Sequence, residues 1–239
     1  MKKFLCIFLC VMLFFSLFSC NKEKEPSPAP IYDVKKINRD IIFDEKDRGD
    51  ITLLYIKLED HEKASELLLD IAERHCRQKL PNLSSYEDGM LPEVTYEIES
   101  IHVTYLSASF LSARVNGTLT VSLAHRPEPF VYTINLDLDN NTEITSADIV
   151  KNFDAIKSLF TSGKFDLAQG RDGLENDTTL EDMIMQYRSE YEIYPYFHFT
   201  KDKLFMNIEL VYALGSNALY SIDISDVKKH LNKISEIIR

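Results

Sequence analysis

The chain has 239 residues, 45% of them hydrophobic, and a formal net charge of −11 at pH 7. Its length and apolar content suit one large domain, or two small ones, with a packed core, and argue against a disordered chain. The acidic excess disfavours nucleic acid and anionic lipid headgroups as partners and favours cationic ones. The same excess is also a common way for a protein to stay soluble.

The first 19 residues have the pattern of a lipoprotein signal peptide. Two lysines form a positive start, and the apolar stretch Phe4–Phe18 follows. This stretch is too short to cross a bilayer core of ~30 Å as a helix and is typical of a secretory signal. Ser19 and Cys20 then resemble a bacterial lipobox, although Phe18 stands where a smaller residue is usual. The alternative is an ordinary signal peptide that is cut near Ser19.

Residues 20–30 are predicted to be a lipidated cysteine followed by a tether. Asn21–Pro30 is charged and proline-rich, so it cannot bury apolar surface and favours extended backbone. Acyl chains on Cys20 would give stable membrane anchoring. The sequence therefore predicts an extracytoplasmic, membrane-anchored lipoprotein. In a diderm organism the outer membrane is favoured, because Asn21 is not the aspartate associated with inner-membrane retention.

The mature chain would keep a single free thiol. The other cysteines leave with the signal or carry the lipid, so only Cys76 remains and no intrachain disulfide is possible. Cys76 shares an apolar helical face with Leu68 and Ala72. This spacing indicates a buried packing residue rather than a nucleophile.

Residues 31–239 are predicted to form one α+β domain. Strands are expected where β-branched and aromatic residues alternate: Tyr32–Phe43, Ile51–Leu58, Val94–Leu106, Ser109–Leu123, Phe130–Leu138, Tyr196–Thr200, Leu204–Leu210 and Ala218–Ile222. Helices are expected at a segment capped by Asp60 and running to Lys79, at Ser146–Val150, Asp154–Phe160 and Thr179–Arg188, and at a final segment capped by Ser225. Turns or loops are expected at Asp44–Asp50 and Ser162–Thr178, and a bulge or bend at Asn116–Gly117. No regular β–α–β alternation appears, so antiparallel sheets with helices packed on one side are favoured.

The best candidate for a metal site is the acidic segment "DLDNNTEITSAD". Asp137, Asp139 and Asn141 alternate in it, as calcium ligands do in an EF-hand loop. Thr142 stands where that loop needs glycine, and the preceding segment is a predicted strand. The alternative is a polar turn at the end of that strand, and no cofactor is expected.

Other candidate residues are aromatic or histidine. The run "YEIYPYFHF" carries Tyr191, Tyr194 and Tyr196, which suit stacking on sugars or peptides, or else form a strand that enters the core. His102 and His125 fall on or beside neighbouring strands, but two histidines are a weak basis for a zinc site. No HExxH, CxxC, Walker loop, GxGxxG or GxSxG motif occurs.

Two segments carry a family resemblance: "VTYLSASFLSARVNGTLTVSLAHRPEPFVYTINLDLDNNTEITSADIV" and "YPYFHFTKDKLFMNIELVYALGSNALYSIDISDVKKHL". They resemble the extracytoplasmic domains typified by the lysozyme-sensing anti-sigma factor RsiV, a domain of unknown function that also occurs beside peptidoglycan deacetylase domains. The matching positions are Ser112, Ala124–His125, Asn135–Asp137, Ile144–Thr145 and Asp148–Ile149. Ser122–Leu123 departs from the two glycines usual before the Ala-His pair.

The resemblance implies an antiparallel α+β module outside the membrane, without chemistry of its own, and it makes His125 a candidate binding residue. We therefore expect a lipid-anchored bacterial envelope protein whose domain binds a cell-wall glycan or a cationic wall-directed protein such as lysozyme. The first alternative is a deacetylase or hydrolase of wall polysaccharide, for which the sequence offers no metal triad. The second is a purely structural envelope lipoprotein.

Overall fold

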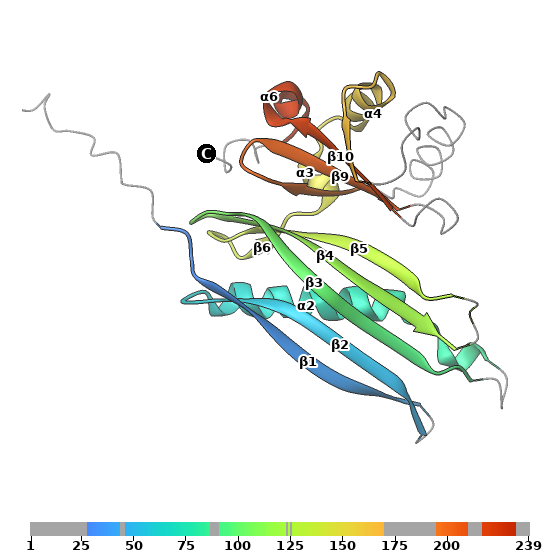
Figure 1. Ribbon diagram of the computed structural model, residues 1–239. Coiled ribbons are helices and arrows are strands. Elements are labelled where there is room, and N and C mark those ends of the chain that lie inside the picture. Colours follow the sequence, from blue (N-terminus) through green and yellow to red (C-terminus); the bar gives the residue numbers. More distant parts are fainter. Residues whose placement is uncertain are drawn as a thin grey trace, which may run out of the picture.

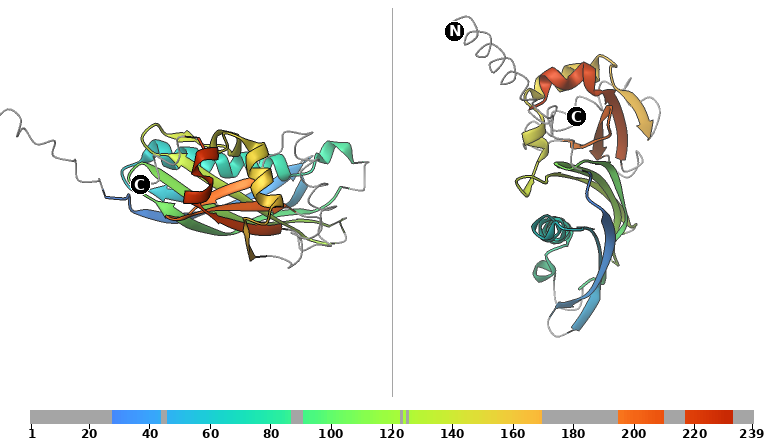
Figure 2. Two further views of the ribbon diagram at one scale, coloured as in Figure 1. Left: turned by 90° about the horizontal axis from the view of Figure 1, so that it is seen from above. Right: turned by 90° about the vertical axis from the view of Figure 1, so that its left-hand side faces the viewer.

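The computed structural model describes residues 28–43, 46–86, 91–122, 124, 126–169, 195–209 and 217–232 (Figure 1). They form two β-sheets with helices, which confirms the predicted α+β class. Figures 1 and 2 show helix α2 along one face of the larger, curled sheet, and α4 and α6 on the side of the smaller sheet that faces away from the larger one. No helix in these ranges is long and apolar enough to cross a membrane.

The larger sheet has the strand order β1-β2-β3-β4-β5-β6, with β1 (Tyr32–Phe43), β2 (Lys46–Leu58), β3 (Val94–Leu106), β4 (Phe110–Val121), β5 (Glu128–Asp137) and β6 (Thr142–Glu143). The smaller sheet has the order β7-β10-β9-β8, with β7 (Asp166–Gln169), β8 (Tyr196–Phe199), β9 (Lys203–Glu209) and β10 (Asn217–Asp223). The helices are α2 (Glu62–Lys79), α3 (Ser146–Ile149), α4 (Phe153–Thr161) and α6 (Ile224–Val227), with 3₁₀ turns η1 (Leu83–Ser85) and η4 (Lys228–His230).

One strand pair departs from the antiparallel pattern that the sequence predicts. Residues 49–52 of β2 run parallel to residues 94–97 of β3, whereas the other neighbouring strands are antiparallel. Parallel neighbours need a long crossover connection, and α2 provides it. The sheet therefore contains one β–α–β unit, which places α2 across the sheet.

Several boundaries differ from the sequence prediction. The expected turn Asp44–Asp50 is partly strand, because β2 begins at Lys46 and its pairing with β1 continues there. The expected loop Ser162–Thr178 contains β7, which pairs with β10. The final helix begins at Ile224 rather than after Ser225. The backbone of Leu231, at the end of η4, then bridges to Val150.

The predicted irregularity at Asn116–Gly117 is present, but the extra residue lies in the partner strand. The register of β3 against β4 shifts between Ile98 and Ser100, opposite these two residues. Gly117 has a packing reason of its own. A β-carbon there would lie 2.3 Å from the carbonyl oxygen of Glu97 and 2.3 Å from the ring of Phe130.

Helix α2 covers the larger sheet through a buried aromatic cluster. His75 is buried among the rings of Tyr96, Phe130 and Tyr132, and it stacks on Tyr132 with centroids 4.0 Å apart. Its Nδ1 lies 2.8 Å from the Tyr96 hydroxyl. Burial, with a smaller contribution from Lys79, lowers the pKa of His75 to about 3.

Cys76 lies beside this cluster and is 3% exposed, so the predicted packing role is confirmed. Burial is the main cause that raises the pKa of its thiol to about 11. The thiol is therefore protonated at neutral pH and packs as a small apolar group.

The two sheets meet through buried hydrogen bonds to the edge of β8. Thr200 N donates to Lys203 O (2.9 Å), so by alternation the backbone groups of Phe197 and Phe199 point away from β9. Asn135 Nδ2 donates to Phe197 O (2.7 Å), and Phe199 N donates to Ser112 Oγ (2.9 Å). Ser112 Oγ in turn donates to Asn135 Oδ1 (2.8 Å). Two side chains of the larger sheet thus complete the hydrogen bonding of a strand in the smaller one.

The other face of β8 carries a second buried histidine. His198 is 3% exposed, stacks on Phe205 with centroids 4.9 Å apart, and has its Nδ1 3.0 Å from Asn207 Nδ2. Burial first, and then the charge of Arg114, lower the pKa of His198 to about 3. Both buried imidazoles are therefore neutral at neutral pH.

We expect the free energy of unfolding to fall as the pH drops below about 6.5. The folded pKa of His75 and of His198 lies well below the ordinary value of 6.5, so the unfolded chain binds protons that the native state excludes. This stability is fully present above pH 6.5 and is lost as the pH falls toward 3. Each histidine contributes a slope of up to ~1.4 kcal/mol per pH unit.

Urea unfolding between pH 7 and pH 5 measures this slope. His75→Gln keeps a polar partner for Tyr96 and should make the slope shallower, whereas His102→Gln, at an exposed position of β3, should leave it unchanged. An equal slope in the wild type and in His75→Gln would show that the buried imidazole does not titrate as described.

Candidate functional site

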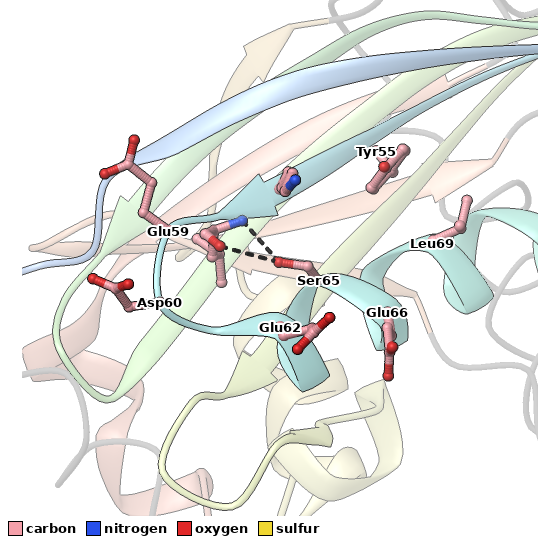
Figure 3. A pocket seen from close by; sticks show the side chains of 9 residues that line it. Tyr55, Glu59, Asp60, Glu62, Ser65, Glu66 and Leu69 are labelled. Atoms are coloured by element: carbon pink, nitrogen blue, oxygen red, sulfur yellow. Dashed lines mark hydrogen bonds between the residues drawn. The ribbon is translucent and has the colours of Figure 1, made fainter.

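A hollow of about 650 Å³ lies where β2 ends and α2 begins (Figure 3). It is lined by Tyr55, Lys57, Leu58, Glu59, Asp60, Glu62, Ser65, Glu66 and Leu69. These residues come from the last part of β2, from the turn after it and from the first two turns of α2. The hollow is therefore formed by one continuous stretch of the chain.

A tight corner holds this stretch in place. Asp60 adopts a left-handed backbone conformation with φ 59°, which reverses the chain between β2 and α2. Ser65 is buried in the floor, and its Oγ accepts a hydrogen bond from Leu58 N (2.9 Å) and lies 2.9 Å from His61 O, to which it can donate. The hydroxyl thus ties the first turn of the helix to the end of the strand.

This corner differs from the sequence prediction for the start of the helix. The sequence predicts that Asp60 caps α2, but His61 occupies the N-cap position and makes no side-chain cap hydrogen bond. The left-handed conformation of Asp60 takes it out of that position. Its carboxylate is exposed at the rim of the hollow instead.

The lining is strongly acidic. Glu59, Asp60, Glu62 and Glu66 are all exposed, and Lys57 is the one cation among the nine lining residues. Glu62 and Glu66 are four residues apart on α2, a spacing at which like charges repel each other. A cationic group bound between them would relieve this repulsion, and negative charge at a helix start is itself favourable.

The opposite wall is less polar. Tyr55 and Leu69 lie at the end of the hollow away from Asp60 (Figure 3). A tyrosine ring attracts a nearby cation through its π-face, and apolar surface accommodates the methylene stems of lysine and arginine. The arrangement suits a basic side chain. Neither histidine nor cysteine lines the hollow.

The predicted acidic segment forms a hairpin turn between β5 and β6. Asp137 accepts hydrogen bonds from Asn140 N (3.0 Å) and Asn140 Nδ2 (2.8 Å), while Asn141 has φ 52° and Asp139 is exposed. These hydrogen bonds and the left-handed conformation of Asn141 are those of a polar turn. Across the described ranges, no group of three or more His, Cys, Asp or Glu side chains is placed to hold a metal ion.

The remaining predicted residues fall mostly outside the described residues. Cys20, His125, Tyr191 and Tyr194 all lie there, so their roles stay predictions. Tyr196 begins β8, is half-buried and packs against the core of the larger sheet. The structure places Tyr196 on the small sheet and the acidic turn on the large one.

Sequence reasoning did not identify the hollow. The signal was available as four carboxylates within the eight residues from 59 to 66. Acidic residues are common at helix starts, and for that reason the run was not distinctive. What the sequence lacks is the reversal at Asp60, which brings the turn carboxylates beside those of the helix.

Comparisons with known proteins identify similar folds but give no activity. No family model matches the chain, and no curated protein matches it. A crystal structure of a DUF3298 family member from Bacteroides fragilis is similar, with 12% identity, a TM-score of 0.51 and coverage of 90% of this chain and 99% of that one. A DUF3298 family protein from Pseudomonas aeruginosa is similar with 11% identity, a TM-score of 0.53 and coverage of 85% and 94%. At these identities the likeness shows a shared fold alone.

Proposed function

We propose that this chain is a lipid-anchored envelope protein whose domain binds a cationic wall-directed protein, such as lysozyme, without catalysing a reaction. The observation that carries the proposal is the acidic hollow at the corner between β2 and α2. The structural neighbours belong to a domain family of unknown function. The sequence resemblance to the lysozyme-sensing RsiV type supports the choice of lysozyme as the first ligand to test.

Long-range charge would act on the encounter. Removing residues 1–19, which include Lys2 and Lys3, changes the formal net charge from −11 to −13. Such a field speeds the approach of a basic partner and weakens as added salt shortens the Debye length from ~10 Å at 0.1 M. Contacts inside the hollow, with Tyr55 and Leu69 beside the carboxylates, would supply the part of the affinity that survives salt.

A wall glycan is the alternative ligand. It would stack on the tyrosines of residues 191–199, of which Tyr196 is half-buried on β8. N-acetylated wall sugars carry no positive charge and gain little from four carboxylates. The hollow therefore favours the cationic protein.

Titration of the mature chain with lysozyme at low and physiological salt tests the proposal. The double variant Glu62→Gln and Glu66→Gln should weaken binding at 0.15 M salt about tenfold, or ~1.4 kcal/mol. The matched control, Glu93→Gln with Glu97→Gln, removes the same charge from exposed positions at and before β3 and should change the affinity far less.

Two results would contradict the hollow as the binding site. Equal losses in the two double variants would reduce the interaction to net charge. Complete loss of wild-type binding at 0.15 M salt would indicate unspecific attraction. Some binding at low salt is expected from charge alone, so only the salt-resistant part counts.

The anchor has a separate test. Cys20→Ala should abolish labelling of the chain by a fatty-acid analogue and release it from the membrane fraction or leave it unprocessed, because the acylated sulfur is removed. A Cys20→Ser variant, which keeps a small polar side chain, should behave in the same way. Acylated, membrane-bound Cys20→Ala protein would rule out this lipobox.

A further inference from the structure

Strand β1 forms a long outer edge of the larger sheet among the strands that the structure describes. It has 12 residues and pairs with β2 on one side alone. The other outer strands are β6 with two residues, β7 with four, and β8, whose edge is covered by Ser112 and Asn135. Proteins usually keep edge strands short or covered, because unpaired backbone groups invite another strand.

Exposed apolar side chains gather on the same strand. The large hydrophobic residues that are exposed in the described ranges are Ile31 (66%), Tyr32 (43%), Val34 (38%) and Ile42 (62%). All four lie on β1 or directly before it. An open edge and a local excess of exposed apolar surface are together the marks of a protein contact.

The pairing with β2 decides which backbone groups are free. Glu59 N donates to Ile31 O (2.8 Å), and the register continues as Tyr32 opposite Leu58 up to Asp40 opposite Asp50. Backbone groups alternate along a strand, so the odd-numbered residues of β1 bond to β2. The even-numbered residues from Tyr32 to Asp40 direct their N–H and C=O groups outward. The register shifts between Asp40 and Ile42, but the extra residue lies in β2, so the alternation of β1 continues to Ile42.

The side chains divide in the same way. The odd-numbered Ile37 and Ile41 pack on the core, and Arg39 pairs with Glu73 of α2. The even-numbered side chains lie on the opposite face of β1, and Tyr32, Val34 and Ile42 are its exposed apolar members. An added strand must match this even-numbered set in hydrogen bonding and in side-chain chemistry.

We propose that β1 pairs antiparallel with β1 of a second copy of the chain, about a two-fold axis at Asn38. In this register Val34 lies opposite Ile42 and Lys36 opposite Asp40, and symmetry repeats both pairs. Within the even-numbered set, Val34 thus meets Ile42 and Lys36 meets Asp40 across the strands. In the odd-numbered set, Lys35 lies opposite Ile41 and Ile37 opposite Arg39. The two sheets join into one.

The neighbouring registers fit less well. Moving the axis to Lys36 sets two lysines opposite each other. Moving it to Ile37 sets Val34 opposite Asp40 and Lys36 opposite Asn38. Like charges that lie directly opposite each other destabilise the Lys36 register, and both registers lose the apolar pair of Val34 with Ile42. The even-numbered charge pattern of β1 is therefore self-complementary in the Asn38 register.

Cysteine cross-linking of the full chain in the membranes of expressing cells tests this register. Directly opposite, hydrogen-bonded residues have Cα atoms ~5.5 Å apart, which suits a disulfide. Asn38→Cys should therefore give a covalent dimer under mild oxidation, well above the level of the parent chain. Lys36→Cys alone should not, because the two positions would lie roughly 13 Å apart along the strands. Co-expressed Lys36→Cys and Asp40→Cys chains should cross-link to each other.

A dimer level for Asn38→Cys no higher than that of the parent would overturn the proposal. So would equal cross-linking by Lys36→Cys, which would indicate random collision. Sedimentation of the full chain in detergent gives an independent result. The wild type should have the mass of two chains, and Val34→Lys with Ile42→Lys should have the mass of one while it keeps a single cooperative thermal transition. A monomeric wild type would contradict the inference.

Discussion

Two buried side chains of the larger sheet complete the hydrogen bonding of a strand that belongs to the smaller sheet. Ser112 accepts from Phe199 N, Asn135 donates to Phe197 O, and the two side chains are bonded to each other. Ser112 is 0% and Asn135 3% exposed, so neither can turn to water instead. A buried polar group without a partner costs ~1–3 kcal/mol. The two sheets are therefore held in one relative position.

This junction also decides where other molecules can approach. It closes the edge of β8 and places β8 against β4 and β5, at one side of the larger sheet. Figure 1 shows β1 and β2 on the side of that sheet farther from the smaller one. The acidic hollow and the open edge of β1 thus lie on the part of the domain that the junction leaves uncovered. A dimer through β1 would carry two hollows, and a partner that reaches both would gain from avidity.

Much of the secondary structure follows from local patterns. β1 has the predicted bounds, and the apolar face of α2, with Leu68, Ala72 and Cys76, is buried as the helical spacing indicates. Errors arose where long-range pairing or backbone conformation decided the outcome. β7 exists because β10 pairs with it, and Asp60 turns into the left-handed region rather than capping the helix. Periodicity carries neither kind of information.

The site was less predictable than the fold for the same reason. Ser112 and Asn135 were visible as positions in a family resemblance, but their contact joins residues 23 apart, and Ser112 meets a backbone amide 87 residues away. The sequence shows that four carboxylates lie close together along the chain, but only the chain reversal at Asp60 brings them around one hollow. Such arrangements are set by tertiary structure, which a single sequence does not state.

The most direct test of this account is a double-mutant cycle at the junction. Urea unfolding would be measured for Ser112→Ala, for Asn135→Ala, for the double variant and for the wild type. Because each side chain is left without its partner by the other's removal, we expect a coupling free energy above about 1 kcal/mol and one cooperative transition in the wild type. Changes that add to within ~0.5 kcal/mol would contradict the claim that these two residues act as one connection between the sheets.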